Sequence, residues 1–148
     1  MVIASSALVA ACAGRGNTGP DFLATTPFGV EAEVDPAELE RHPRGFYFRE
    51  VRLGLGQEAA PGRRVYVAYV VRLADGREVD RAEPEEPVTF KLGDGGVIPA
   101  LDAALRGMKP GGTRQLVVPS RLGYGARGNG PVPPGAVLVM MVTLVRVD

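Results

Sequence analysis

Residues 65–80, VYVAYVVRLADGREVD, carry the most regular pattern in this chain of 148 residues. Apolar and aromatic side chains recur at every second position, which is typical of a β-strand with one buried face; they are Val65, Val67, Tyr69, Val71 and Leu73. The Asp75-Gly76 step that follows favours a tight turn, and an extended pattern resumes at Val79. The stretch therefore predicts a long antiparallel hairpin.

Other segments extend this pattern on both sides of the hairpin. Alternating or β-branched runs occupy residues 46–51, 88–92, 116–118 and 137–147. Helical spacing appears in a segment that begins after Pro99, runs through Leu101, Leu105 and Met108, and ends at Lys109-Pro110-Gly111-Gly112. One short helix among about five strands predicts an α+β fold, with an antiparallel sheet wrapped over the helix.

The charge balance and the reactive side chains exclude several classes of function. The chain has 17 basic and 17 acidic residues, so it lacks the basic excess typical of nucleic-acid-binding proteins. It has one cysteine, Cys12, and one histidine, His42, which are too few for a disulfide, a Cys/His metal site or a Cys/His dyad. The sequence therefore predicts no nucleic-acid partner, no metal and no cofactor.

The first 12 residues resemble a processing signal. The apolar run from Val2 to Ala11 is shorter than the roughly 20 residues that span a bilayer. Val9, Ala10 and Ala11 followed by Cys12 resemble the lipobox of bacterial lipoproteins, in which the cysteine is lipidated. This reading predicts an extracytoplasmic protein held on the periplasmic side or at the outer membrane, with membrane contact only through the lipid. The alternative is an apolar N-terminus with a stray cysteine.

Residues 13–44 are interpreted as a tether that contains a short helix. From Ala13 to about Thr26 the chain lacks apolar periodicity. Asp35 and Pro36 are typical of the start of a helix, which we expect to run through about Arg41. The folded domain is then expected to span residues 45–148.

Within residues 45–148, motifs in a fixed order resemble the FKBP-type peptidyl-prolyl cis-trans isomerases. The motifs are Val65-x-Val67-x-Tyr69, Leu73-x-Asp75-Gly76-x-x-x-Asp80, Phe90-x-Leu92-Gly93, Val97-Ile98-Pro99-Ala100-Leu101, Leu105-x-Gly107-Met108-x-x-Gly111, Tyr124-Gly125-x-x-Gly128 and Val132-Pro133-Pro134. The resemblance implies a half-barrel antiparallel sheet around a short helix, with a hollow that accepts the proline of a peptide. It also implies two kinds of partner, proline-containing polypeptides and a macrolide-type inhibitor.

The resemblance also implies the residues of the site. The expected catalytic residues are Tyr69, Asp80, Ile98 and Tyr124. The expected substrate-binding residues are Val79, Val88, Val97, Leu101, Val132 and Met140. The Ile98 N–H and the Tyr124 hydroxyl are expected to donate hydrogen bonds to the substrate, and Asp80 to orient it. Without the family context, the better interpretation of Val79, Leu101 and Met140 is as core residues, and that of Asp80 is as a solvated carboxylate of the hairpin.

The implied reaction agrees with the short inventory of reactive groups. Rotation about an X-Pro bond crosses a barrier of about 18–20 kcal/mol because amide resonance is lost, and no covalent bond breaks. The expected function is to assist the folding of exported proteins. Where the family commonly carries aromatic side chains, this chain has Val79, Val88, Leu101 and Met140. An aliphatic floor at Leu101 leaves open a non-catalytic, peptide-binding or chaperone-like module.

Overall fold

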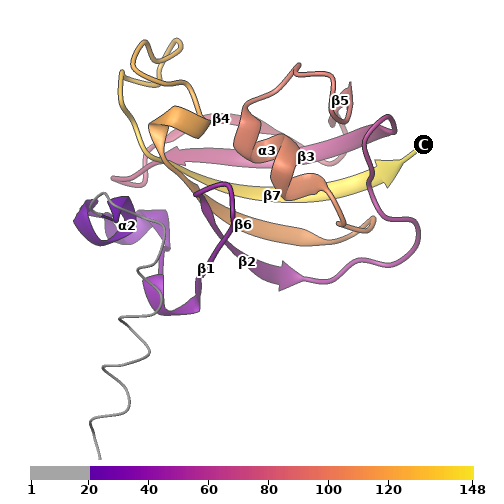
Figure 1. Cartoon of the computed structure of the whole chain (residues 1–148), viewed down its shortest axis with the longest axis horizontal. Helices are drawn as coiled ribbons and strands as arrows, with labels where there is room; N and C mark the ends of the chain where they lie inside the picture. The colour runs from indigo at the N-terminus through magenta and orange to yellow at the C-terminus, as the bar shows by residue number, and fades with distance from the viewer. Residues whose placement is uncertain (1–20) are drawn as a thin grey trace, which may run out of the picture.

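The computed structural model describes residues 21–148 and shows an open, antiparallel sheet of seven strands with a short helix across one face (Figure 1). The order is β1-β2-β6-β7-β3-β4, and β5 pairs with β3 beside this path. The strands are β1 (Glu40–Arg41), β2 (Tyr47–Arg52), β3 (Arg64–Leu73), β4 (Glu78–Ala82), β5 (Val88–Lys91), β6 (Thr113–Val118) and β7 (Leu138–Val147). The helices are α2 (Phe22–Thr25) and α3 (Pro99–Leu105), with 3-10 turns η1 (Val30–Ala32), η2 (Pro36–Glu38) and η3 (Ser120–Leu122).

The predicted α+β class and the antiparallel sheet over a short helix are confirmed. The sheet has seven strands where about five were expected. One of the additions, β1, is two residues long, so it is too short to show any period in sequence.

The hairpin predicted from residues 65–80 is formed by β3 and β4. Val71 lies opposite Asp80, and the Gly76 N–H donates to the Leu73 carbonyl at 2.9 Å across the turn. Gly76 has φ +98°, a backbone angle that residues with a Cβ rarely adopt. On its other side β3 pairs with β7 along its whole length, from Val65 opposite Val147 to Leu73 opposite Leu138. The two longest strands therefore form the centre of the sheet.

The main core lies between the sheet and α3. Alternation along β6 sends Leu116 and Val118 into this core, whereas Val117 faces the opposite side. The helix ends at Leu105, earlier than its apolar spacing predicts, and Met108 is buried just beyond it. Gly107 has φ +83°, so the chain turns out of the helix there. No helix among residues 21–148 is long and apolar enough to cross a membrane.

Residues 22–39 pack on the opposite face of the sheet and residues 40–41 join the sheet as β1, so this segment does not form a tether. Leu23 packs with Tyr47 and Val117 in a second apolar cluster, and the Tyr47 hydroxyl donates to Asp21 at 2.7 Å. Buried Gln115 reaches the same segment, because its amide donates to the Glu33 carbonyl at 3.0 Å. The irregular chain expected up to Thr26 is therefore wrong for residues 21–25, which include α2.

The helix expected through Arg41 is also shorter than predicted. Asp35 caps the turn as expected, with the Ala37 N–H donating to its side chain at 3.0 Å, but the turn ends at Glu38. Residues Glu40 and Arg41 are extended because they pair with β2. The domain boundary at Gly45 stays a prediction, and Cys12 lies outside the described residues.

His42 joins this N-terminal segment to β2. Its ring stacks on Phe46 with centroids 4.3 Å apart, and its Nδ1 accepts from the Arg44 N–H at 3.1 Å. Burial, followed by the positive charges of Arg44 and Arg114, lowers the pKa of His42 below its usual value of 6.5. The neutral ring is therefore the form that the fold favours.

We expect His42 to make the fold sensitive to acid. A histidine whose pKa is lowered by folding contributes stability above its unfolded pKa of about 6.5, and this stability is lost as pH falls through the lower folded pKa. Replacing His42 by asparagine keeps a side-chain acceptor for Arg44 but removes the titration. The melting temperature of the wild type should fall more steeply than that of His42→Asn between pH 7 and pH 5. Parallel pH profiles for the two proteins would contradict this prediction.

Candidate active site

A cavity of about 640 Å³ opens on the α3 side of the sheet. Its walls come from strands β3, β4, β5 and β7, from the loop between β5 and α3, from α3 itself and from the start of the segment that joins η3 to β7. The lining residues are Tyr69, Val71, Asp80, Val88, Thr89, Phe90, Gly95, Gly96, Val97, Ile98, Pro99, Leu101, Gly123, Tyr124, Asn129 and Met140. The cavity thus combines an aliphatic interior with a small number of polar groups.

Most of the predicted site residues meet at this cavity. Eight of them line it: Tyr69, Asp80, Val88, Val97, Ile98, Leu101, Tyr124 and Met140. The other two, Val79 and Val132, line an adjoining cavity of about 200 Å³. Val71, Asp80, Tyr124 and Asn129 line both cavities, so the two spaces adjoin at these residues. The catalytic and binding roles themselves stay predictions.

Tyr69 and Asp80 form a polar pair on neighbouring strands. The Tyr69 hydroxyl donates to Asp80 Oδ2 at 3.0 Å, and Asp80 Oδ1 accepts from the Arg81 N–H at 2.8 Å. Burial, and then the hydrogen bond to Asp80, raises the pKa of Tyr69 to about 12. The phenol therefore stays protonated at neutral pH, and its bond fixes the direction in which the Asp80 carboxylate points.

Ile98 stands where the β5–α3 loop enters the helix. Its carbonyl accepts from the N–H groups of Leu101 at 3.1 Å and Asp102 at 3.3 Å, which are the first bonds of α3. Its own N–H makes no hydrogen bond to any group among residues 21–148. Because Ile98 lines the cavity, this N–H is a donor that a ligand can use.

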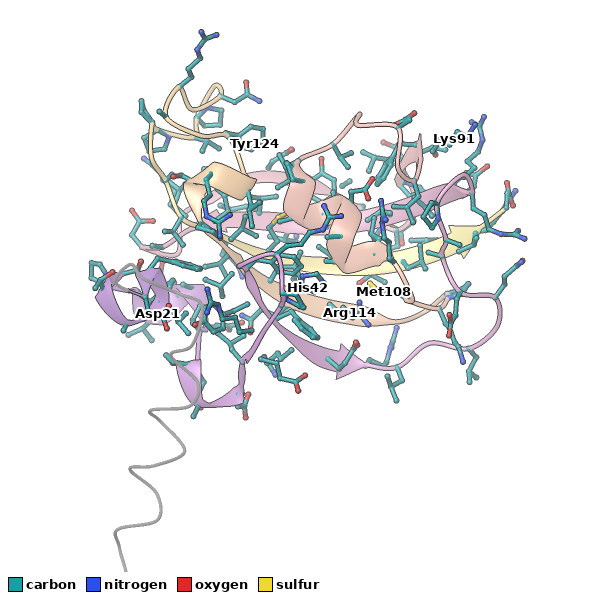
Figure 2. All side chains as sticks on the ribbon, viewed as in Figure 1. Asp21, His42, Lys91, Met108, Arg114 and Tyr124 are labelled. Atoms are coloured by element: carbon teal, nitrogen blue, oxygen red, sulfur yellow. The ribbon has the colours of Figure 1, made fainter. Side chains whose placement is uncertain are left out.

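Tyr124 stands at the start of a loop that is closed by its own hydrogen bonds. The Gly125 N–H donates to Ser120 at 2.7 Å, and the Gly135 N–H returns to the Gly125 carbonyl at 3.0 Å. Within the loop, the Gly128 N–H donates to the Tyr124 carbonyl at 3.2 Å. Figure 2 shows Tyr124 where this loop approaches α3. Among the described residues, the tyrosine hydroxyls with a hydrogen bond are those of Tyr47, Tyr66 and Tyr69, and that of Tyr124 has none.

The floor of the cavity is aliphatic. Leu101 on α3 is 4% exposed and Met140 on β7 is 3% exposed, so both side chains exclude water effectively. The aromatic side chains of the lining are Tyr69, Phe90 and Tyr124, and all three are half-buried. The most deeply buried side chains of the lining therefore include an aliphatic one and a thioether, Leu101 and Met140.

Phe90 is a lining residue that the sequence prediction missed. It lies two residues after Val88 on β5, so the period of two places both side chains on the same face. The spacing of Phe90 from Val88 was therefore the sequence signal that could have identified it as a lining residue. Gly95, Gly96 and Asn129 were also missed, because loop residues reach the cavity through backbone turns that follow no period.

The described side chains were also compared with the arrangements that bind metal ions. Residues 21–148 contain no group of three or more histidine, cysteine, aspartate or glutamate side chains that could hold a metal ion. The polar side chains among the lining residues are one carboxylate, two phenols, the Thr89 hydroxyl and the Asn129 amide, beside the Ile98 N–H. Such groups can bind and orient a peptide, but they form no nucleophile–base pair.

Comparison with known protein families shows which family the chain matches. A family model described as FKBP-type peptidyl-prolyl cis-trans isomerase matches residues 56–145. The chain belongs to this family. The matched range contains every residue of the cavity described above.

Individual FKBP relatives agree with this assignment. The chain is 39% identical over 105 residues to an FK506-binding protein of Neisseria meningitidis serogroup B, covering 70% of this chain and 96% of that protein. It is 37% identical over 123 residues to peptidyl-prolyl cis-trans isomerase FKBP15-3 of Arabidopsis thaliana, covering 81% and 83% of the two chains.

Solved structures show the same fold. A peptidyl-prolyl cis-trans isomerase from Pseudomonas syringae superposes with a TM-score of 0.69 at 31% identity, covering 90% of this chain and 99% of that one. FkpA from Escherichia coli superposes with a TM-score of 0.70 at 33% identity, and the match covers 80% of this chain and 55% of FkpA. These identities support a shared enzyme class as well as a shared fold.

The free Tyr124 hydroxyl leads to a prediction for activity. Replacing Tyr124 by phenylalanine removes one donor and keeps the ring, so we expect prolyl isomerisation to slow by about two- to tenfold, the value of one ordinary hydrogen bond. Tyr66→Phe is the matched control, because Tyr66 lies on β3 outside the cavity lining and its hydroxyl donates to Asp148, which follows β7. Equal rates for the two variants in a peptide isomerisation assay would show that the Tyr124 hydroxyl takes no part.

Proposed function

We propose that this FKBP-type chain isomerises X-Pro bonds in exported polypeptides, and that the cavity between β3, β4, β5 and α3 is its active site. The observation that supports this most is that two residues with donors unpaired among residues 21–148, Ile98 with its N–H and Tyr124 with its hydroxyl, line a cavity that also contains the buried side chains of Leu101 and Met140. A peptide carbonyl needs such donors, whereas the proline ring needs the apolar floor.

The mechanism relies on differential binding of the twisted imide. A planar X-Pro amide is stabilised by resonance that separates charge, and this resonance is lost at the twisted transition state. A cavity floored by Leu101 and Met140 solvates the charge-separated planar form poorly, so it favours the twisted one. The Ile98 N–H and the Tyr124 hydroxyl hold the substrate carbonyls while the bond rotates, and Asp80 orients the peptide at the rim. No covalent bond forms or breaks.

The test is to follow cis-to-trans relaxation of an X-Pro tetrapeptide with and without the full chain. Spontaneous relaxation takes tens to hundreds of seconds at 25 °C, and faster relaxation in the presence of the chain supports the proposal. Inhibition of this acceleration by a macrolide would place the activity in the same cavity. Relaxation at the spontaneous rate in the presence of the chain would contradict the proposed isomerase function.

The aliphatic floor favours a second candidate function, a peptide-binding module without catalysis. Leu101 and Met140 give no flat surface on which a proline ring stacks, and such stacking is worth about 0.5–1.5 kcal/mol. Binding of proline-containing peptides to a chain that leaves their isomerisation rate unchanged would favour this candidate. The identities of over 30% to proteins described as isomerases favour catalysis.

The location that we propose is extracytoplasmic, with the chain anchored by lipid on Cys12. The proposal is supported by the run Val9-Ala10-Ala11-Cys12 alone, which lies outside the described residues. A radiolabelled fatty acid should be incorporated into the wild type and not into Cys12→Ser. Equal labelling of the two proteins would contradict the anchor and would leave the isomerase proposal unaffected.

A further inference from the structure

The loop from Gly93 to Ile98 forms one wall of the cavity and carries the Ile98 N–H. Gly95, Gly96, Val97 and Ile98 all line the cavity. Gly93 and Gly95 have φ values of +91° and +83°, so the loop depends on backbone angles that glycine adopts freely. Glycine-rich segments lose the most conformational freedom on folding, so this wall needs contacts from elsewhere to hold one conformation.

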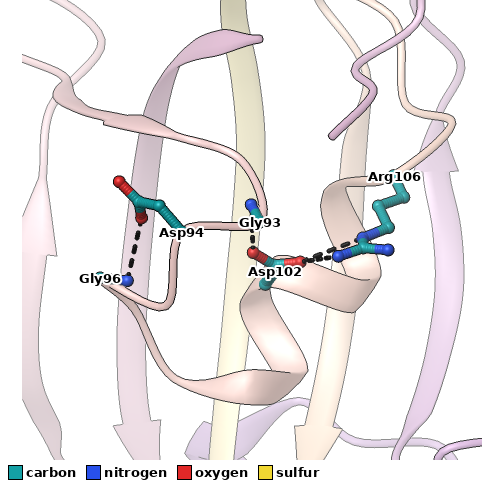
Figure 3. A network of polar contacts seen from close by, with 5 residues as sticks. All are labelled: Gly93, Asp94, Gly96, Asp102 and Arg106. Carbon is teal, nitrogen blue, oxygen red and sulfur yellow. Dashed lines mark hydrogen bonds and ion pairs between the residues drawn. The ribbon is translucent and has the colours of Figure 1, made fainter. Parts of the chain in front are cut away.

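Those contacts converge on Asp102 in the first turn of α3 (Figure 3). Asp102 Oδ2 accepts a hydrogen bond from the Gly93 N–H at 2.7 Å, at the first residue of the loop. The Asp102 N–H donates to the Ile98 carbonyl at 3.3 Å, at the last residue of the loop. One residue therefore bonds both ends of the six-residue segment 93–98.

The Asp102 carboxylate is itself held in place. Its other oxygen, Oδ1, accepts from Arg106 Nε at 3.0 Å and Nη2 at 2.8 Å, one turn further along α3. The side chain of Asp102 is 14% exposed and that of Arg106 is 40% exposed, so the carboxylate is mostly covered while the guanidinium lies at the surface. Within the loop, Asp94 Oδ1 accepts from the Gly96 N–H at 3.1 Å, but this contact does not reach α3.

We propose that Asp102 is a positioning residue that closes the loop from Gly93 to Ile98 and thereby fixes the Ile98 N–H and the Val97 wall in the orientation that isomerisation needs. Asp102 itself does not line the cavity, so it acts through the loop. Arg106 supports it by orienting the carboxylate. This inference rests on the proposed isomerase function for its kinetic consequence, whereas the closure of the loop can be measured without substrate.

The experiment compares Asp102→Ala and Asp102→Asn in the full chain, with Asp35→Ala as the matched control. Asp35 also accepts a hydrogen bond from a backbone N–H, but it lies in the N-terminal segment outside the cavity lining. We expect Asp102→Ala to lower kcat about tenfold with little change in KM, since small misplacements of a catalytic group cost up to about 100-fold. Asp102→Asn keeps a neutral acceptor for Gly93 and should recover part of that loss. Asp35→Ala should leave both constants unchanged.

Hydrogen exchange of the amides at residues 93–98 gives the second readout. It should speed up most at Gly93, whose N–H loses its acceptor in Asp102→Ala, while the amides of β3 and β7 keep their protection. Arg106→Ala should cause a smaller change in the same direction, and the double variant should be no worse than Asp102→Ala. Arg106→Ala and Asp102→Asn keep the test decisive if Asp102→Ala fails to fold.

The two readouts separate the possible failures. Normal kcat and normal loop exchange in Asp102→Ala, with an active wild type, would overturn the positioning role. An inactive wild type would overturn the proposed isomerase function, and faster loop exchange in Asp102→Ala would then still support the closure by Asp102. A global loss of protection in every Asp102 and Arg106 variant would show a merely structural residue and would overturn the proposal.

Discussion

Replacing Ile98 by proline is expected to lower kcat/KM for X-Pro isomerisation at least about tenfold, the equivalent of about 1.4 kcal/mol. The substitution removes the backbone N–H of a lining residue, a donor that makes no hydrogen bond among residues 21–148. Ile98 has φ −60°, close to the angle of about −65° that the proline ring imposes, so the backbone can keep its course. The donor is lost without displacing the helix that follows.

The control is Ile98→Val, which keeps the N–H and trims one methyl group from a half-buried side chain. It should retain most of the activity. Melting temperatures show whether the proline variant is folded, and relaxation of a tetrapeptide measures the rate. A folded Ile98→Pro with the kcat/KM of Ile98→Val would mean that the substrate carbonyl is held by another group.

The second large effect is expected for Gly128→Ala, in the loop that follows Tyr124. A Cβ at Gly128 would lie 2.3 Å from the Val132 carbonyl oxygen and 2.8 Å from the Pro133 carbonyl carbon, both rigid backbone atoms. Its φ of +71° adds about 1–2 kcal/mol for any residue with a Cβ. The loop must move, and with it the Tyr124 carbonyl that accepts from the Gly128 N–H. We expect a lower melting temperature and a loss of kcat/KM of about tenfold or more.

Gly130→Ala separates the steric clash of the new Cβ from the cost of the left-handed backbone angle. Gly130 has a similar left-handed backbone, with φ +53°, but no atom lies within 4 Å of the position of its Cβ. The Gly130→Ala variant should pay only for the unfavourable backbone angle, which lowers its melting temperature by a few degrees, and it should keep its activity. If Gly128→Ala behaved like Gly130→Ala in both assays, the close packing of this loop would have no role in holding Tyr124.

Local patterns were sufficient to predict the main elements. The hairpin of β3 and β4 follows from alternation up to Leu73 and from the Asp75-Gly76 turn, and α3 follows from Pro99 and the spacing of Leu101 and Leu105. These signals arise within one strand or one helix, where the period of the side chains and the backbone angles of glycine and proline act directly. The end of α3 was predicted too late, because Met108 is buried beyond the end of the helix at Leu105 and its spacing from Leu105 resembles helical spacing.

The candidate site could be predicted only with the family motifs as a guide. Ordered matches such as Val97-Ile98-Pro99 and Tyr124-Gly125 brought together residues that no period connects, and eight of the ten expected residues line one cavity. Phe90 was missed although its spacing from Val88 indicated it. Val79 and Val132 were expected in the same space and line the adjoining one.

The pairing of β1 with β2 and the contacts of residues 21–44 with the sheet depend on the folded molecule. A two-residue strand such as β1 has no period of its own, and it is extended because β2 offers hydrogen bonds. The bond from the Gly93 N–H to Asp102 likewise joins groups nine residues apart, at a distance that only the turn into α3 makes short. Alternation, turn residues and motif order therefore predicted the α+β class, the main hairpin, the helix and the family. Contacts between distant segments placed the N-terminal segment, the division between the two cavities and the closure of the loop, because their free energy appears only when the chain brings those segments together.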